Sequence, residues 1–193
     1  MPRKLYAVLV GINEYHPETS VNHLKGCVND VYAMSNFLID NFQYLDPEIT
    51  LVLNKDATKK NLLITFEKQL GKAGPEDIAL FYYSGHGSYE NTSPEFETYD
   101  SMNQNETLVC YDSRLRGHED LADKEIAVLL ERLDPTSQKI LILDCCHTGS
   151  ITRGELKGLS RQEPAREYAN SIYRRPIDSY MLPGDNYYLK QKL

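Results

Sequence analysis

A histidine between two glycines and a pair of adjacent cysteines have residue types that suit nucleophilic catalysis. The histidine is His86, in residues 84–87 (SGHG), and the cysteines are Cys145 and Cys146, in residues 144–149 (DCCHTG). A histidine beside a thiol can take its proton, which makes a thiolate nucleophile, and can give that proton to a leaving amine. The glycines allow a substrate backbone to approach and leave backbone N–H groups to bind an oxyanion. The sequence therefore predicts a Cys–His pair for acyl transfer.

Zinc binding is a weaker interpretation of the cysteine motif. Successive residues of a strand point to opposite faces, so Cys145, Cys146 and His147 rarely converge on one ion. The other two cysteines, Cys27 and Cys110, are far away in the sequence, and no CxxC pair occurs. The cysteine spacing indicates neither a zinc ribbon nor a disulfide framework, and it favours a reducing, cytoplasmic location.

Four short apolar runs predict the strands that must position these residues. They are Leu5–Val10, Ile49–Leu53, Ile78–Tyr83 and Ile140–Leu143. Near-continuous apolar runs are typical of strands buried on both faces of a parallel sheet. The stretches between them have helical periodicity, with Asn29, Thr58 and Asp123 as predicted N-caps. This alternation predicts a three-layer α/β/α sandwich with a mostly parallel sheet, in which ligands bind beyond the carboxyl ends of the strands.

Length and charge exclude several classes of function. The 193 residues predict one main folded domain, and 21 basic against 28 acidic residues give a net charge of −7. An acidic balance argues against a nucleic-acid binder and fits a basic substrate. No apolar run reaches the roughly 18 residues of a membrane helix. A flavodoxin-like nucleotide or phosphate binder is disfavoured, because no glycine-rich phosphate loop follows the first strand at Gly11.

The two motifs resemble the catalytic motifs of metacaspases and of their prokaryotic relatives, the orthocaspases, which are caspase-like cysteine peptidases. The resemblance extends to residues 6–15 (YAVLVGINEY) and 24–30 (LKGCVND), and it covers roughly residues 5–150. It implies a caspase-like fold in which His86 is the catalytic base and acid and Cys146 is the nucleophile. It also implies an oxyanion hole made by the backbone N–H groups of Gly87 and Cys146. The chemistry would need no cofactor.

The resemblance further implies an acidic pocket for the substrate residue that precedes the scissile bond. The matching positions are Cys27, Asp30, Ser84 and Asp144. Carboxylates beside a nucleophile are costly unless a cation pairs with them, and an arginine or lysine of the substrate would supply that cation. The expected partners are therefore proteins or peptides with Arg or Lys before the cleaved bond.

A calcium site that activates the enzyme is a weaker implication of the resemblance. The family uses acidic residues in the loop after the catalytic histidine and ahead of the next helix, and calcium takes six to eight oxygen ligands. The candidates here are Asp100, Asp112, Asp120 and Asp123, with Glu125 nearby. The stretch 88–120 is polar and is predicted to be mostly loop, with a short hairpin around Thr107–Tyr111.

The C-terminal region departs from the family pattern. A complete caspase-like domain has six strands, of which the last two form a small subunit, whereas only four are identifiable here. The sequence thus predicts a large-subunit catalytic domain over residues 1–150 and a basic, mobile tail or linker over 151–193. The strand at Leu141–Leu143 would be an exposed apolar edge unless the tail, a small subunit or a further chain covers it.

Two more expectations follow from this region. The missing strands leave open a second interpretation, a catalytically silent caspase-like scaffold or regulatory subunit. The basic residues of the tail predict self-processing between Arg153 and Arg174, because mobile segments are where nicking concentrates. The bond between Arg175 and Pro176 is disfavoured by the proline ring.

Overall fold

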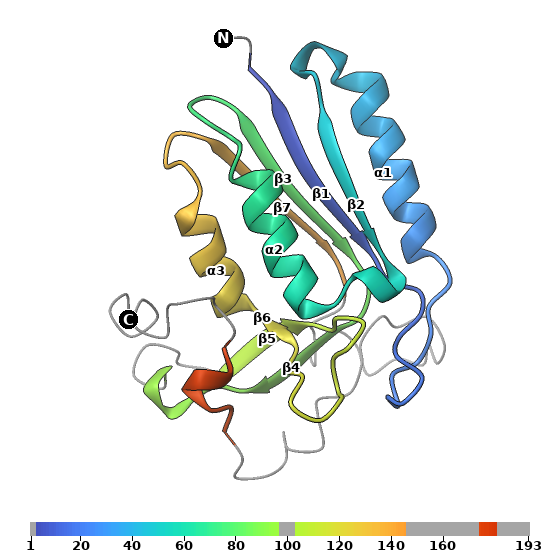
Figure 1. Ribbon diagram of the computed structural model, residues 1–193, viewed down its shortest axis with the longest axis vertical. Coiled ribbons are helices and arrows are strands. Elements are labelled where there is room, and N and C mark those ends of the chain that lie inside the picture. Colours follow the sequence, from blue (N-terminus) through green and yellow to red (C-terminus); the bar gives the residue numbers. More distant parts are fainter. Residues whose placement is uncertain (1–2, 97–102, 146–173, 181–193) are drawn as a thin grey trace, which may run out of the picture.

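Four parallel strands form the central sheet of the computed structural model, which describes residues 3–96, 103–145 and 174–180. The strands are β1 (Leu5–Gly11), β2 (Glu48–Leu53), β3 (Ile78–Ser84) and β7 (Gln138–Asp144), in the order β2-β1-β3-β7 (Figure 1). All three pairings are parallel. The four apolar runs of the sequence are these four strands, so the predicted α/β fold with a mostly parallel sheet is confirmed.

The register of the sheet brings the carboxyl ends of three strands level with one another. Gly11 at the end of β1 pairs with Ser84 at the end of β3, and Ser84 pairs in turn with Asp144 at the end of β7. Loops that follow these strands therefore leave the sheet from one edge, which is where open parallel sheets place their sites.

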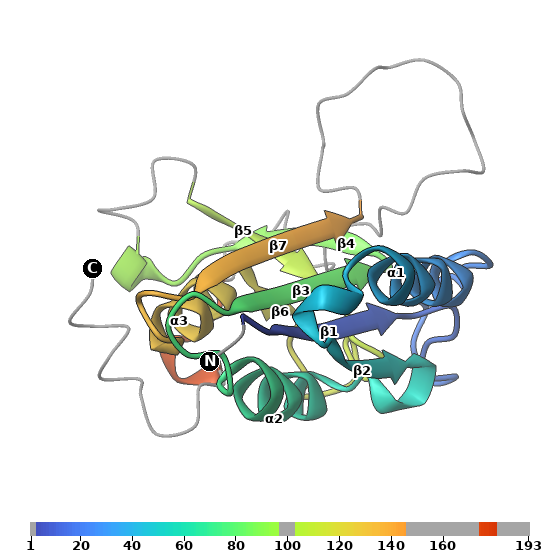
Figure 2. The ribbon, with the colours of Figure 1, turned by 90° about the horizontal axis from the view of Figure 1, so that it is seen from above.

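Helices cover both faces of the sheet. On one face α1 (Cys27–Asn41) packs its apolar side on Leu9 and Leu80, and on the other α2 (Lys59–Leu70) and α3 (Asp123–Arg132) pack on Val8 and Phe81. Neighbouring strand residues thus belong to opposite cores, as the period of two in a strand requires. Figure 1 shows α2 and α3 in front of the sheet, and Figure 2 shows α1 on the side away from α2.

The N-caps of the helices agree with the sequence at one position of three. The hydroxyl of Thr58 caps α2 and accepts a hydrogen bond from the backbone N–H of Asn61 at 3.3 Å. Two predicted caps are wrong. Asn29 lies inside the first turn of α1, whose N-cap is Gly26, and α3 starts at Asp123 with Ala122 as its N-cap. The carboxylate of Glu125 serves that end instead, because it accepts from the backbone N–H of Ala122 at 2.9 Å.

A small antiparallel sheet occupies much of the stretch predicted to be loop. Its strands are β4 (Gly87–Asn91), β5 (Gln104–Leu108) and β6 (Leu121–Ala122), in the order β4-β5-β6. The prediction of a stretch that is mostly loop is therefore wrong for β4 and for the first part of β5, whereas the end of β5 overlaps the hairpin predicted around Thr107–Tyr111. The sequence does not predict β5 in full, because its buried residues include the polar Asn105 and Thr107. Their side chains form hydrogen bonds to Tyr180 and Asp120, which a pattern of apolar residues cannot reveal.

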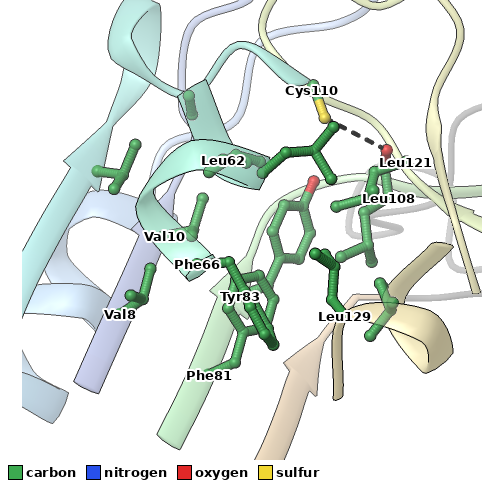
Figure 3. Packing of buried hydrophobic residues seen from close by; sticks show 14 of the residues in the cluster. Val8, Val10, Leu62, Phe66, Phe81, Tyr83, Leu108, Cys110, Leu121 and Leu129 are labelled. Carbon is green, nitrogen blue, oxygen red and sulfur yellow. Dashed lines mark hydrogen bonds between the residues drawn. The ribbon is translucent and has the colours of Figure 1, made fainter. Parts of the chain in front are cut away.

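The core is continuous between the two sheets. The rings of Phe66 and Phe81 lie 5.4 Å apart under α2, and Tyr83 extends from the end of β3 toward Leu108 and Cys110 (Figure 3). Leu108 and Leu121 of the small sheet belong to the same buried apolar cluster as Tyr83 of the central sheet. Short 3-10 helices complete the described structure at Gln43–Leu45, Asn54–Asp56, Pro94–Phe96 and Ile177–Ser179.

The strand β7 is an edge of the central sheet within the described residues. Leu141 is 40% exposed and Ile142 is 36% exposed, although both lie on a strand whose neighbour β3 is buried throughout. The predicted apolar edge is thus present in this part of the chain. The boundary predicted at residue 150 lies outside the described residues. Residues 174–180, which belong to the predicted tail, pack against the small sheet.

None of the helices in the described ranges has the length and apolar character that a bilayer crossing requires.

Candidate active site

His86 sits between the end of β3 and the start of β4, and its backbone is held on both sides. Its N–H donates a hydrogen bond to the phenol oxygen of Tyr15 at 2.9 Å. Its carbonyl oxygen accepts from the N–H of Val109 at 3.0 Å and from the hydroxyl of Tyr83 at 2.9 Å. The position of this histidine is therefore fixed by contacts from the loop after β1, from β3 and from the segment after β5.

The imidazole of His86 is held in one orientation. Its Nε2 lies 2.8 Å from the backbone carbonyl oxygen of Asn22, and the side chain is only 2% exposed. A carbonyl oxygen can only accept, so Nε2 carries the proton of the neutral ring and Nδ1 keeps its lone pair. The ring of Tyr15 lies beside the imidazole, with centroids 5.2 Å apart and planes tilted by 35°. This arrangement makes Nδ1 the nitrogen that can act as a base.

A glycine is needed at position 85 because a side chain there would collide with Tyr83. A Cβ at position 85 would lie 2.5 Å from the hydroxyl oxygen of Tyr83 and 2.8 Å from its Cζ. The Tyr83 ring is buried completely and cannot move aside cheaply. The absence of a side chain at Gly85 thus allows the hydroxyl of Tyr83 to reach the carbonyl of His86.

The four positions predicted to line the substrate pocket lie around the same strand ends. The hydroxyl of Ser84 donates to Oδ2 of Asp30 at 3.1 Å, and Ser84 pairs in register with Asp144. Cys27 is buried in the first turn of α1, where its carbonyl oxygen would lie 2.8 Å from a Cβ on Gly11. Asp30 is half-buried and Asp144 is exposed, so both carboxylates are accessible at this edge.

Cys146, the predicted nucleophile, lies outside the described residues, as does His147. The last described residue before them is Cys145, which is partly buried and packs on the core cluster under α2 and α3. The strand ends nevertheless relate the two motifs. His86 is the second residue after Ser84, Cys146 is the second residue after Asp144, and Ser84 and Asp144 are register partners.

Gly87, the predicted oxyanion-hole residue, is the first residue of β4. It is buried and pairs with Leu108 across the β4–β5 ladder. Its place directly after His86 makes the position of its N–H depend on the small sheet.

Two of the predicted calcium ligands, Asp112 and Asp120, already form hydrogen bonds or ion pairs with other groups of the protein. Asp112 accepts a hydrogen bond from the backbone N–H of Lys59 at 2.9 Å. Asp120 is buried, forms an ion pair with Arg114 at 2.8 Å and accepts from the hydroxyl of Thr107 at 3.0 Å. A hard cation would have to displace these partners, so the two carboxylates do not fit a calcium site.

The remaining candidates do not complete such a site. Asp123 accepts from the backbone N–H of Lys124 at 2.9 Å, and Asp100 lies outside the described residues. Glu125, also considered, pairs with Lys59 at 2.8 Å. Within the described ranges, no group of three or more His, Cys, Asp or Glu side chains could hold a metal ion. The described residues therefore do not support the expected calcium site.

Three residues that shape the site were not identified as functional from the sequence. Tyr15 and Tyr83 hold the backbone of His86, and the carbonyl of Asn22 holds its ring. Burial raises the pKa of both phenols well above the ordinary value, so they stay protonated and neutral. Tyr15 lies within the motif at residues 6–15, but nothing in the sequence relates it to a histidine 71 positions later.

Comparison with known proteins places most of the chain within one family model. The model described as "Metacaspase, peptidase C14 domain" matches residues 5–153. Metacaspase-1A of Aspergillus terreus is 31% identical over 154 residues, which cover 76% of this chain and 36% of that protein. Metacaspase-1 of Meyerozyma guilliermondii is 33% identical over 153 residues, which cover 75% of this chain and 35% of that protein. The chain thus spans about a third of the length of these curated relatives.

A solved structure supports the fold. The crystal structure of protein GSU0716 from Geobacter sulfurreducens aligns with a TM-score of 0.63 at 21% sequence identity, and the alignment covers 98% of this chain and 62% of that one. At this identity the likeness concerns the arrangement of the elements alone.

Proposed function

This chain belongs to the metacaspase family of C14 peptidases, and on that premise we propose that it is a cysteine endopeptidase that cleaves after Arg or Lys. The observation that supports the proposal most directly is the pairing of Ser84 with Asp144 at the ends of adjacent strands. His86 follows Ser84 by two residues, and Cys146 follows Asp144 by two residues.

In the proposed reaction, Nδ1 of His86 takes the proton of the Cys146 thiol. The thiolate attacks the carbonyl carbon of the scissile bond, and the oxyanion that forms accepts hydrogen bonds from the backbone N–H groups of Gly87 and Cys146. The tetrahedral intermediate collapses as His86 gives its proton to the leaving amine. Water, deprotonated by His86, then attacks the thioester and releases the acid product together with the regenerated thiol.

The carbonyl of Asn22 contributes by holding the imidazole. When His86 takes the thiol proton, its ring becomes a cation, and a carbonyl 2.8 Å from Nε2 stabilises that charge through a charge-assisted hydrogen bond. It also keeps Nδ1 facing one direction, so that the same nitrogen accepts and returns the proton. In this reaction the protein supplies side chains and backbone groups, and water is the second reactant.

Specificity for a basic residue is attributed to Asp30 and Asp144. Two carboxylates flank Ser84 at the strand ends, and the net charge of −7 has the sign that attracts a basic peptide. An aspartate of a substrate would meet charges of its own sign and would be rejected. A reduced nucleophilic thiol is needed throughout, which fits a reducing compartment such as the cytoplasm.

Self-processing is proposed for the part of the tail that precedes the docked segment. Arg174 is half-buried and its Nη1 lies 3.5 Å from the carbonyl oxygen of Asn103, and Arg175 beside it is buried. A cut after Arg174 would require both residues to leave the domain. The proposed cuts are therefore after basic residues farther upstream, namely Arg153, Lys157, Arg161 and Arg166.

A catalytically silent scaffold that binds another chain is the second candidate function. The exposed apolar side chains of Leu141 and Ile142 on the edge strand β7 favour it, because a small subunit or a further chain could add a strand there.

A panel of fluorogenic peptides that differ only in the residue before the cleaved bond separates the two candidates. The peptidase is expected to hydrolyse the Arg and Lys peptides and to leave the Asp peptide intact. A peptidyl-arginine electrophile should also label one cysteine of the wild type. Absence of both hydrolysis and labelling would favour the scaffold.

A further inference from the structure

Residues 174–180, here called the strap, insert two side chains into the small sheet. Arg175 and Tyr180 are each only 1% exposed, although the strap comes from a tail that is basic and far from this sheet in the sequence. The backbone N–H of Arg175 also donates to the carbonyl of Asn91 at 3.4 Å. A buried arginine is rare unless it is fully paired, so its partners indicate what the strap does.

The guanidinium of Arg175 uses all five of its N–H donors. Nη1 donates to Oε1 of Glu90 at 2.6 Å and to the carbonyl of Asp120 at 3.2 Å. Nη2 donates to Oε2 of Glu125 at 3.2 Å and to the carbonyl of Ser179 at 3.1 Å. Nε donates to the hydroxyl of Ser179 at 3.1 Å. A lysine has only three donors without the fixed planar geometry, so the site is specific for arginine.

The charges around Arg175 balance among the described residues. Three buried or nearly buried carboxylates lie beside three cations, and they form the pairs Glu90–Arg175, Asp120–Arg114 and Glu125–Lys59, with a second contact from Arg175 to Glu125. Burial raises the pKa of Glu90, and the charge of Arg175 opposes that rise. Removal of Arg175 would leave a buried carboxylate uncompensated, which is strongly destabilising.

Tyr180 completes the hold of the strap. Its hydroxyl oxygen accepts from Nδ2 of Asn105 at 2.8 Å and from the backbone N–H of Ser93 at 3.3 Å. Its ring packs edge-on against Phe96 at 5.2 Å, and the guanidinium of Arg175 lies 4.0 Å from the ring centroid. The strap thus contacts β5 and the segment after β4 as well as the carboxylates.

One partner of Arg175 lies on β4, the strand that starts next to His86. Glu90 is in β4, the strand that begins directly after His86, and Glu125 is in the first turn of α3. Asp120 immediately precedes β6. One guanidinium therefore ties β4 to α3 and to the entry of β6. Because β4 is a short strand, its first residues are held by this tie and by the ladder with β5.

We propose that Arg175 is a positioning residue for His86, and that the strap must be docked on the small sheet for the enzyme to work. This inference rests on the proposed peptidase function. The strap holds β4 in place, and β4 begins at Gly87, directly after His86. It follows that self-processing upstream of residue 174 leaves the C-terminal piece bound through Arg175 and Tyr180.

The test compares full-length variants at position 175. Arg175→Met removes the charge and all five donors, and Arg175→Lys keeps the charge. The double variant Arg175→Met/Glu90→Gln removes both charges and avoids the uncompensated carboxylate, so we expect it to fold even where the single variant fails. Arg132→Met is the matched control, because Arg132 also pairs with a glutamate, Glu67, but does so between α2 and α3 with both side chains partly exposed.

Two measurements are made on each variant. Hydrogen exchange of residues 87–96, followed by mass spectrometry in a Cys146→Ala background, reports the hold on β4 without any need for activity. Steady-state kinetics in the active background report the chemistry. In Arg175→Met and in the double variant, we expect faster exchange and a kcat that is roughly 10- to 100-fold lower, as for a misplaced catalytic group. KM should change by less than about threefold, because substrate binding is not what the strap affects.

The outcomes separate this inference from the peptidase assignment. Arg175→Lys should recover part of kcat, and Arg132→Met should match the wild type in both measurements. Wild-type kcat in the double variant, or unchanged exchange of residues 87–96, would overturn the inference. If the wild type itself hydrolyses no peptide, the proposed function fails, whereas exchange of residues 87–96 still decides whether the strap holds β4.

Discussion

The Nε2 atom of His86 lies 2.8 Å from the backbone carbonyl oxygen of Asn22, which is 64 positions earlier in the chain. Because the partner is a backbone atom, no side chain at position 22 is needed for it, and a substitution there does not remove it. The carbonyl can only accept, so the contact favours the proton on Nε2, and in the proposed reaction Nδ1 is then the nitrogen that accepts the thiol proton. The loop that carries Asn22 therefore belongs to the candidate site, although it contributes no catalytic side chain.

Tyr15→Phe tests the other contact that holds His86. The change keeps the ring beside the imidazole but leaves the buried N–H of His86 without its acceptor. We expect the free energy of unfolding to fall by about 1–3 kcal/mol, the cost of an unsatisfied buried donor. Urea denaturation measures it. Tyr44→Phe is the control, because Tyr44 is 73% exposed and its loss of a hydroxyl should cost almost nothing. Equal stabilities for the two variants would contradict the role of Tyr15.

Gly85→Ala tests the contact between Tyr83 and the carbonyl of His86. The new methyl group would lie 2.5 Å from the hydroxyl of Tyr83, so the ring or the backbone must shift. We expect a loss of about 1–3 kcal/mol of stability from overpacking, together with a lower kcat. Gly74→Ala is the matched control, since its methyl group would meet only Asp77 at 3.7 Å. A Gly85→Ala enzyme with wild-type stability and kcat would argue against this geometry.

The sequence predicted the parts of the fold whose physics is local. The four strands of the central sheet are runs of apolar residues, and Thr58 is a cap that a single residue defines. The small sheet was missed because its strands carry polar residues such as Asn105, whose partner Tyr180 is 75 positions away. Burial of such side chains is decided by tertiary contacts, which a pattern along the chain does not contain.

In the candidate site, too, some residues were predicted from sequence motifs and others depend on tertiary contacts. His86 and the pocket positions were predicted because they stand in motifs at strand ends, and the hydroxyl of Ser84 donates a hydrogen bond to Asp30. The calcium prediction is not supported at Asp120, which is paired with Arg114, and acidity in the sequence alone does not show such a pairing. The docked strap was not predicted, because nothing in the sequence distinguishes Arg175 from the other basic residues of the tail.

Asp30→Asn tests the assignment of the acidic pocket. Asparagine keeps the shape of the side chain and can still accept from Ser84, but it removes the charge that would face a substrate arginine. We expect kcat/KM for Arg peptides to fall roughly 10- to 100-fold, since a charged hydrogen bond contributes about 1.5–3 kcal/mol. Asp40→Asn, in the exposed last turn of the same helix, should leave kcat/KM unchanged. Similar values for both variants would remove Asp30 from the pocket.

Self-processing predicts a definite pattern of fragment masses. Wild-type protein incubated after purification should be cleaved after one or more of Arg153, Lys157, Arg161 and Arg166. No cut should follow Arg174, which belongs to the strap and contacts the carbonyl of Asn103. Cys146→Ala should remain intact. Intact-mass spectrometry over time decides the matter. Identical masses for both proteins would contradict self-processing and leave the peptidase assignment standing, whereas a cut after Arg174 would show that the strap undocks.

The nucleophile is tested most directly by comparing Cys146→Ala with Cys145→Ala on one fluorogenic Arg peptide. Only the thiolate at position 146 is assigned to attack, and alanine offers no substitute for it. Cys145 packs its side chain on the core, so its removal should cost some stability and little turnover. We expect no detectable hydrolysis by Cys146→Ala and most of the wild-type rate in Cys145→Ala. Hydrolysis that survives in Cys146→Ala, or that is lost equally in both variants, would contradict the assignment of Cys146 and His86 as the reacting pair.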